Sequence, residues 1–158
     1  MQVLTPQPIT TGFNIAIVIS RFNPEVTQKL YDGAVERLKE LHFTPQQVTI
    51  VWVPGAVEVP LAAQCLAKTK RFEAIICFGA VIMGETKHFD YVCQQVSHGC
   101  QQVALSHNIP VIFGILTVET EEQAHERTGG AHGHLGRLHV DTACEFVSVL
   151  RQFENFRD

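Results

Sequence analysis

The chain has 158 residues, the usual length of one domain, and we expect a single domain over residues 1–158. Apolar residues make up 46% of the chain and charged residues 18%, which excludes intrinsic disorder and provides enough apolar side chains for a core. Twelve basic residues against sixteen acidic ones give a net charge of −4 without a long basic run, which argues against nucleic-acid binding.

Neither a membrane-spanning segment nor a signal peptide is apparent in the sequence. The longest apolar run, residues 74–83, is too short to cross a bilayer, and residues 1–11 contain no basic residue and no apolar core. We therefore expect a cytoplasmic protein that makes no contact with a membrane.

The cysteines and histidines do not predict a metal site. The five cysteines are scattered and never form a C-x-x-C pair, so reduced, buried thiols are the better interpretation. His132 and His134 form a candidate metal pair, but no cysteine or acidic residue accompanies them at ligand spacing. A flexible polar loop explains these two histidines better.

Extended apolar segments alternate with helical patterns along the whole chain. Four segments are short and rich in Ile and Val, as strands are: residues 13–19, 48–53, 74–82 and 111–118. Helices are predicted over residues 24–41, over 57–66, after residue 84, after a capping box at 120–123, and after a Gly/His-rich loop at 129–136. Asn23 is expected to cap the first helix. On the last helix the predicted inward residues are Ala143, Phe146, Val147, Leu150 and Phe153.

Strands separated by helices, without hairpin signals, predict a parallel sheet covered on both faces. The expected fold class is α/β, a three-layer α/β/α sandwich with a central four-stranded parallel sheet. In such sheets the ligand binds beyond the carboxyl ends of the strands. The candidate site therefore lies in the segments that directly follow the strands.

Residues 84–88 are the most informative of these segments. They combine a glycine, the hydroxyl of Thr86 and free amides at a helix start, which suits a phosphate group. His88 lies beside that position and could transfer a proton near neutral pH. The alternative is an ordinary capped helix with a solvated histidine.

Three further side chains are candidates, each with a plain structural alternative. Glu58 could accept hydrogen bonds from sugar or polyol hydroxyls, or be a solvated carboxylate in a first helical turn. Phe22 could stack on a planar ring, or lie at the edge of the core. Arg127 could bind phosphate, or be an ordinary surface arginine.

Taken together and in order, five segments resemble the sequence blocks of the lumazine synthase family of riboflavin biosynthesis. They are residues 20–23, 53–62, 79–92, 110–117 and 121–127, and the resemblance covers about residues 13–130. It implies a flavodoxin-like fold and a transferase that condenses 5-amino-6-(D-ribitylamino)uracil with 3,4-dihydroxy-2-butanone 4-phosphate. The implied products are 6,7-dimethyl-8-ribityllumazine, phosphate and water, without a metal or organic cofactor.

The resemblance also implies a role for each matching residue. Phe22 would stack on the pyrimidine, and Glu58 would bind the ribityl hydroxyls. Backbone groups would hold the ring and the ribityl chain at Ala56, Val57, Ala80, Val81 and Ile82. Glu85 and Thr86 would bind the phosphate, and His88 would move protons. A neighbouring subunit would supply Phe113 to the ring and Arg127 to the phosphate.

The family resemblance further implies assembly of the chain with copies of itself. Members form homopentamers, which in many cases build an icosahedral shell, and riboflavin synthase is a candidate partner. Residues 1–12 are a candidate segment for pairing with a neighbouring subunit.

Leu135 departs from the family pattern, because many members carry a lysine near the phosphate at this position. We hypothesise that His132 or His134 partly replaces that lysine. Met83 likewise stands where an arginine is frequent.

Two other functions are compatible with the same resemblance. One is the related archaeal-type riboflavin synthase, which would consume the lumazine, and the other is a shell-forming or flavin-binding protein without turnover. The block around His88 and Arg127 favours lumazine synthesis, and Leu135 alone favours the binding protein.

Overall fold

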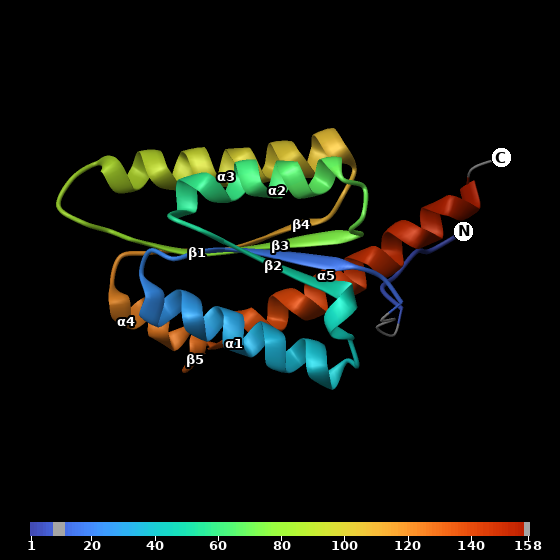
Figure 1. Ribbon diagram of the computed structural model, residues 1–158, viewed down its shortest axis with the longest axis horizontal. Helices are drawn as coiled ribbons and strands as arrows, with labels where there is room; N and C mark the ends of the chain where they lie inside the picture. The colour runs from blue at the N-terminus through green and yellow to red at the C-terminus, as the bar shows by residue number, and fades with distance from the viewer. Residues whose placement is uncertain (8–11, 157–158) are drawn as a thin grey trace.

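The computed structural model describes residues 1–7 and 12–156. It has three layers, with a parallel sheet between two layers of helices (Figure 1). The strands lie in the order β2-β1-β3-β4, so the two longest stretches of buried backbone are central. Their bounds are β1 Ile15–Ser20, β2 Val48–Val53, β3 Ala74–Ile82 and β4 Val111–Val118. This arrangement confirms the predicted fold class.

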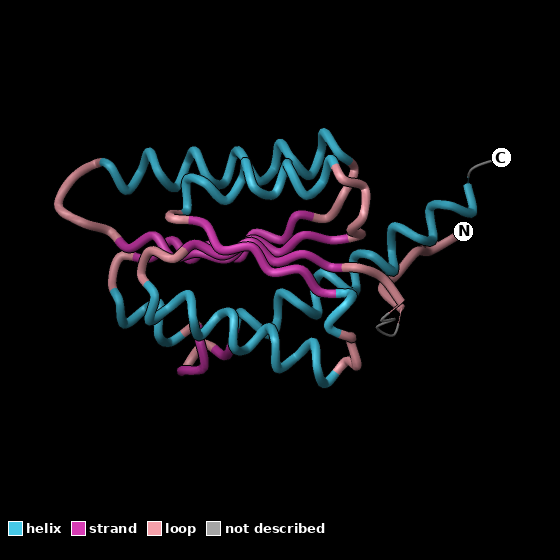
Figure 2. Tube along the Cα trace, viewed as in Figure 1, coloured by secondary structure: helices cyan, strands magenta, loops and turns pink. Residues whose placement is uncertain are grey.

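Helices cover both faces of the sheet, as Figures 1 and 2 show. One face carries α1 Pro24–Glu40, α4 Glu121–Glu126 and α5 Leu135–Gln152. The other face carries α2 Val59–Lys68 and α3 His88–His107. Short 3-10 turns lie at η1 Pro45–Gln47, η2 Ala56–Glu58 and η3 Phe153–Phe156.

The sheet separates two hydrophobic cores because successive strand residues point to opposite faces. Ile15, Ile17 and Ile19 of β1 face α1 and α5, and Ala16 and Val18 face α2 and α3. All five are fully buried, as expected of a central parallel strand covered on both sides.

Ion pairs join α1 to α5 at the surface of the larger core. Arg37 Nε bonds to Asp141 at 2.8 Å, and Arg137 bonds to Glu36 at 2.9 Å and to Glu40 at 2.7 Å. The Arg137 guanidinium lowers the pKa of the Glu40 carboxyl, with Arg37 adding to the effect. These contacts fix the two helices that flank the segment after α4.

Three local expectations from the sequence are wrong. The predicted loop at residues 129–136 is instead a small antiparallel hairpin, β5 Thr128–Gly130 with β6 Gly133–His134, and α5 begins at once. Phe146 of α5 is 46% exposed, and Phe153 is 50% exposed because it lies in the turn η3, beyond the end of that helix. Asn23 makes no side-chain cap; its φ is 58°, and its amide donates to the Ala80 carbonyl at 2.8 Å.

The amino-terminal residues lie along the end of α5. Gln7 N donates to Ser148 Oγ at 3.0 Å, and the Gln152 amide donates to the Thr5 carbonyl at 2.7 Å. Residues 8–11, within the segment considered for pairing with a neighbour, lie outside the described residues. In the described ranges, no helix has the length and apolar character needed to cross a bilayer.

Candidate active site

A pocket of about 360 Å³ lies at the carboxyl ends of the strands, on the side of the sheet covered by α2 and α3. The end of β3, the turn η2 and the start of α3 form its walls, and Phe22 lies at its rim. It is lined by Phe22, Asn23, Gly55, Ala56, Val57, Glu58, Ala80, Val81, Ile82, Gly84, Thr86, His88, Phe89 and Val92. Nine of the twelve residues predicted for the site line this pocket.

Phe22 follows β1, and its backbone is hydrogen-bonded to the segment that follows β2. Its amide donates to the Pro54 carbonyl at 3.1 Å, one step beyond the bond from Arg21 N to Val53 O at 2.8 Å. The pairing between β1 and β2 thus continues past the strand ends and presents the ring outward. Phe22 is 69% exposed, so most of the ring is free for a ligand.

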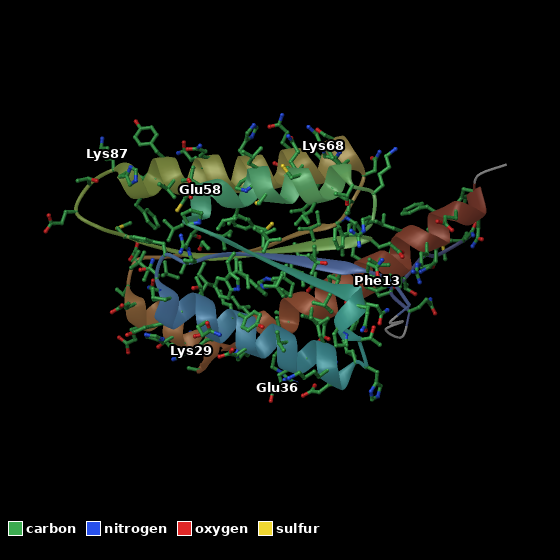
Figure 3. All side chains as sticks on the ribbon, viewed as in Figure 1. Phe13, Lys29, Glu36, Glu58, Lys68 and Lys87 are labelled. Carbon is green, nitrogen blue, oxygen red and sulfur yellow. The ribbon has the colours of Figure 1, made fainter. Side chains whose placement is uncertain are left out.

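Glu58 closes a small hydrogen-bonded turn at the edge of the pocket. Its Oε2 accepts from Gly55 N at 2.8 Å, which fixes the carboxylate at the start of α2. Figure 3 labels Glu58 at this helix start and Lys87 before α3, both at the same end of the molecule. Because one carboxylate oxygen is occupied by Gly55, the other remains available to hydroxyl donors.

The end of β3 supplies backbone to the pocket at Ala80, Val81 and Ile82. This strand pairs with β4 through Ile82 and Val118, and Met83 N then donates to the Val118 carbonyl at 2.9 Å. Ala80 is buried, and its carbonyl accepts the Asn23 amide. Hydrogen bonds from Met83 to β4 and from Asn23 to Ala80 therefore fix the end of β3.

The loop after β3 brings Thr86 and His88 to the open side of the pocket. His88 is the first residue of α3, and its amide donates to Thr86 Oγ1 at 3.3 Å. Both side chains are exposed and therefore accessible to a ligand. The amino terminus of the 20-residue helix α3 adds a favourable potential for an anion.

Three predicted site residues do not line this pocket: Glu85, Phe113 and Arg127. Phe113 lies on the edge strand β4 and pairs with Cys77 of β3, three residues before Ala80 and so about 10 Å along the sheet from it. Its side chain is 39% exposed. Arg127 ends α4 in the opposite helix layer, where its Nη1 donates to the Gln123 carbonyl at 2.9 Å. Neither side chain is brought to the pocket of its own chain.

The sequence interpretation missed several lining residues. Asn23 was assigned to helix capping, and Phe89 and Val92 lie on the helix that the sequence predicts after residue 84. The two α3 residues are only half-buried, because the helix overhangs the end of the sheet at its first turns. Its apolar stripe therefore continues into the pocket wall.

The residues after Arg127 have distinct surroundings. Leu135 packs against the larger hydrophobic core, and the half-buried His134 lies against Gly33 of α1. His132 Nε2 is 3.7 Å from Glu126 Oε2, which is also 3.9 Å from Arg127 Nη1. The lysine of the family pattern is thus replaced by a core side chain.

A second hollow, of about 600 Å³, lies at the opposite end of the sheet. It is lined in part by Lys70, Glu73 and Arg151, and Arg151 forms an ion pair with Glu73 at 2.8 Å. None of the predicted site residues lines this hollow. Within residues 1–7 and 12–156, no group of three or more His, Cys, Asp or Glu side chains could hold a metal ion.

Known proteins of one family resemble this chain along most of its length. The model of the family described as 6,7-dimethyl-8-ribityllumazine synthase matches residues 12–151. A protein of that name from Coxiella burnetii (strain Dugway 5J108-111) is 52% identical over 91% of this chain and 95% of its own length. The proteins of the same name from strains CbuG_Q212 and RSA 493 are 51% identical over the same shares. Among solved structures, a de novo designed Rossmann fold protein aligns with a TM-score of 0.40 and 13% identity, over 71% of this chain and 90% of that chain. The chain belongs to the 6,7-dimethyl-8-ribityllumazine synthase family.

Proposed function

We propose that the pocket at the end of β3 condenses 5-amino-6-(D-ribitylamino)uracil with 3,4-dihydroxy-2-butanone 4-phosphate to give 6,7-dimethyl-8-ribityllumazine, phosphate and water. The observation that carries this proposal is the meeting of Phe22, Glu58, Thr86 and His88 in one pocket of about 360 Å³. Four separate segments of the chain supply these four groups, and each group matches one part of the two substrates. Family membership supplies the reaction.

The pyrimidine and its ribityl chain fit the inner part of the pocket. Phe22 offers an exposed ring for stacking, and the end of β3 offers backbone donors and acceptors at Ala80, Val81 and Ile82. Ala56 and Val57 bound the opposite wall, and Glu58 binds the ribityl hydroxyls with its free carboxylate oxygen.

The phosphate of the butanone binds at the start of α3. Glu85 contributes its backbone amide, Thr86 its hydroxyl, and the helix terminus a positive potential. His88 then moves protons as the amine attacks the ketone carbonyl, water leaves, and phosphate is eliminated. Because both substrates are intrinsically reactive, holding them together supplies much of the acceleration, up to ~7–11 kcal/mol in the best intramolecular cases.

The site is completed by a neighbouring copy of the chain. Phe113 and Arg127 are kept away from their own pocket by the strand register and by the position of α4. Large apolar side chains remain exposed, as at an assembly surface: Trp52, Leu61, Tyr91, Leu105, Phe113, Leu138 and Phe146. We propose a homopentamer, with an icosahedral shell as the larger assembly.

Three further proposals follow from the family. The chain forms one synthase domain, and its amino-terminal segment contacts a neighbouring subunit. Riboflavin synthase, which consumes the product, is the proposed partner. The proposed compartment is the cytoplasm, and the buried free thiols Cys77, Cys100 and Cys144 are compatible with its reducing conditions.

A steady-state assay with both substrates, followed by lumazine absorbance, tests the reaction. His88→Ala should lower kcat by about 100-fold or more, as loss of a general acid–base does. The matched control is His107→Ala at the other end of the same helix, about 28 Å away, which should keep wild-type kcat. Absence of product from the wild-type protein, with the pyrimidine still bound, would instead support a binding or shell protein.

A further inference from the structure

The ring of His134 fills a notch formed by three glycines. A methyl group at Gly33 of α1 would overlap Cε1 of His134 and lie 2.6 Å from both ring nitrogens. A methyl group at Gly136 would lie 3.0 Å from Cε1, and one at Gly129 would lie 3.5 Å from Cδ2. The ring is therefore enclosed by α1, by β5 and by the first turn of α5.

Gly33 is a costly residue for its position. It lies inside the 17-residue helix α1, where glycine is less favourable than alanine. Gly33 is buried and faces the hairpin, so removing its side chain is what lets the imidazole approach the helix backbone. The glycine and the histidine thus form a matched pair across two elements far apart in the sequence.

The hairpin that carries His134 also fixes Arg127. Leu135 N donates to the Arg127 carbonyl at 2.9 Å, and His132 N donates to the Glu126 carbonyl at 2.8 Å. Thr128, which pairs with His134, donates its hydroxyl to the Ala124 carbonyl at 3.2 Å. Figure 2 shows this short hairpin beside α1. Its contact with α1 therefore helps to fix the backbone of Arg127, together with the bond from Arg127 N to the Ala124 carbonyl at 3.2 Å.

We propose that His134 is a positioning residue, whose ring anchors the hairpin to Gly33 of α1 and so places Arg127 for the phosphate of the butanone substrate. This inference rests on the proposed function of Arg127. It assigns His134 a role as a neutral ring that fills space, in place of the cationic role that the family's lysine would have.

The surroundings of His134 favour the neutral ring. Burial lowers its pKa, and the nearby Arg137 adds to this shift, while Glu36 and Asp32 oppose it. Lys39 and His134 line the same hollow on the surface. Among the described residues, the buried Nδ1 has no hydrogen-bond partner, so a charged ring would bury an unpaired N–H donor there.

A double-mutant cycle in the full-length enzyme tests this arrangement. His134→Ala should raise KM for the butanone phosphate by about 10-fold, through a displaced Arg127, with KM for the pyrimidine changed less than about twofold. Gly33→Ala should do the same, because its methyl group displaces the ring. The double variant should be no worse than His134→Ala alone, since the three atoms nearest to that methyl group all belong to the ring. If Gly33→Ala alone fails to fold, recovery of folding in the double variant would likewise show that the methyl group clashes with the ring of His134.

The pH dependence separates positioning from a charge on His134. Wild type and His134→Ala should show parallel changes in KM for the butanone phosphate between pH 6 and 8. A rise in KM with pH that disappears in His134→Ala would make the histidine a cationic phosphate ligand and overturn the proposal. If the double variant raised KM by the product of the two single effects, the ring and the glycine would act independently, and this result would also overturn the proposal.

Hydrogen exchange tests the anchor without any assay of activity. The amides of His132 and Leu135 should lose protection in His134→Ala, whereas His132→Ala, in the same hairpin but 59% exposed at its side chain, should leave the Leu135 amide protected. Unchanged exchange in His134→Ala would overturn the anchor. A wild-type enzyme without turnover would refute the proposed function, and the exchange result alone would then decide whether His134 fixes Arg127.

Discussion

Phe22→Ala should weaken binding of the pyrimidine and leave the fold nearly intact. Phe22 is 69% exposed, which leaves about 140 Å² of its side chain free, given that an aromatic residue buries roughly 150–250 Å². A stacked ring covers one face, about half of that area. At ~25 cal/mol per Å² the lost contact is worth about 1.8 kcal/mol, or about 20-fold in affinity. This agrees with the ~1–3 kcal/mol measured for a base stacked on an aromatic side chain.

Calorimetric titration with the pyrimidine measures this effect directly, and thermal unfolding checks the fold. Phe22→Tyr should keep the affinity, because it keeps the ring. The control is Phe153→Ala, which removes a half-exposed ring at the far end of the molecule and should leave the affinity unchanged. An affinity of Phe22→Ala within twofold of wild type would refute the stacking role.

Three further substitutions test separate parts of the site and the core. Glu58→Gln removes a charged acceptor, so calorimetry should show about 10-fold weaker binding of the pyrimidine, and unchanged binding would contradict the ribityl contact. Thr86→Val removes the hydroxyl and should raise KM for the butanone phosphate about fivefold, with pyrimidine affinity as the control. Burial lowers the pKa of His139, so the unfolded state takes up the proton first, and stability should fall as the pH drops below about 6.5. His139→Leu should flatten that slope in urea unfolding at pH 7.5 and pH 5; an equal slope would show that other groups cause it.

The sheet was predictable from the sequence because its strands are buried. Residues 48–53, 74–82 and 111–118 were predicted with the bounds that the structure has, since runs of Ile and Val end where Pro or Gly begins or where polar residues follow. Their parallel order places the four following loops at one end, and this was enough to bring Phe22, Glu58 and His88 together.

The hairpin after α4 could not be predicted from local signals. Its strands have three and two residues, too few for any periodicity, and their glycines and histidines are typical of a loop. What orders them is a contact with Gly33, about a hundred residues earlier in the chain. The prediction that Phe146 faces inward was wrong for a related reason. Helical spacing does not reveal which apolar side chain packs in its own core and which one a neighbouring copy would cover.

The proposed division of the site between subunits restricts how copies can assemble. The pocket lies on the side of α2 and α3, whereas Arg127 lies in the other helix layer and Phe113 on the edge of the sheet. A contact that joins one patch to a different patch is head-to-tail, and such contacts close into a ring when the rotation between copies is a whole fraction of a full turn. A two-fold dimer would complete both sites only if one continuous surface carried both the pocket and Arg127, and these lie on opposite sides of the sheet.

Mixing two inactive variants tests that division. In His88→Ala the pocket is defective and Arg127 is intact, and in Arg127→Ala the reverse holds. When equal amounts are unfolded and reassembled together, about a quarter of the sites should combine an intact pocket with an intact arginine, provided that the two come from different chains. Activity should then recover to about a quarter of that of reassembled wild type. If both groups came from one chain, every site would carry a defect and mixing would restore nothing.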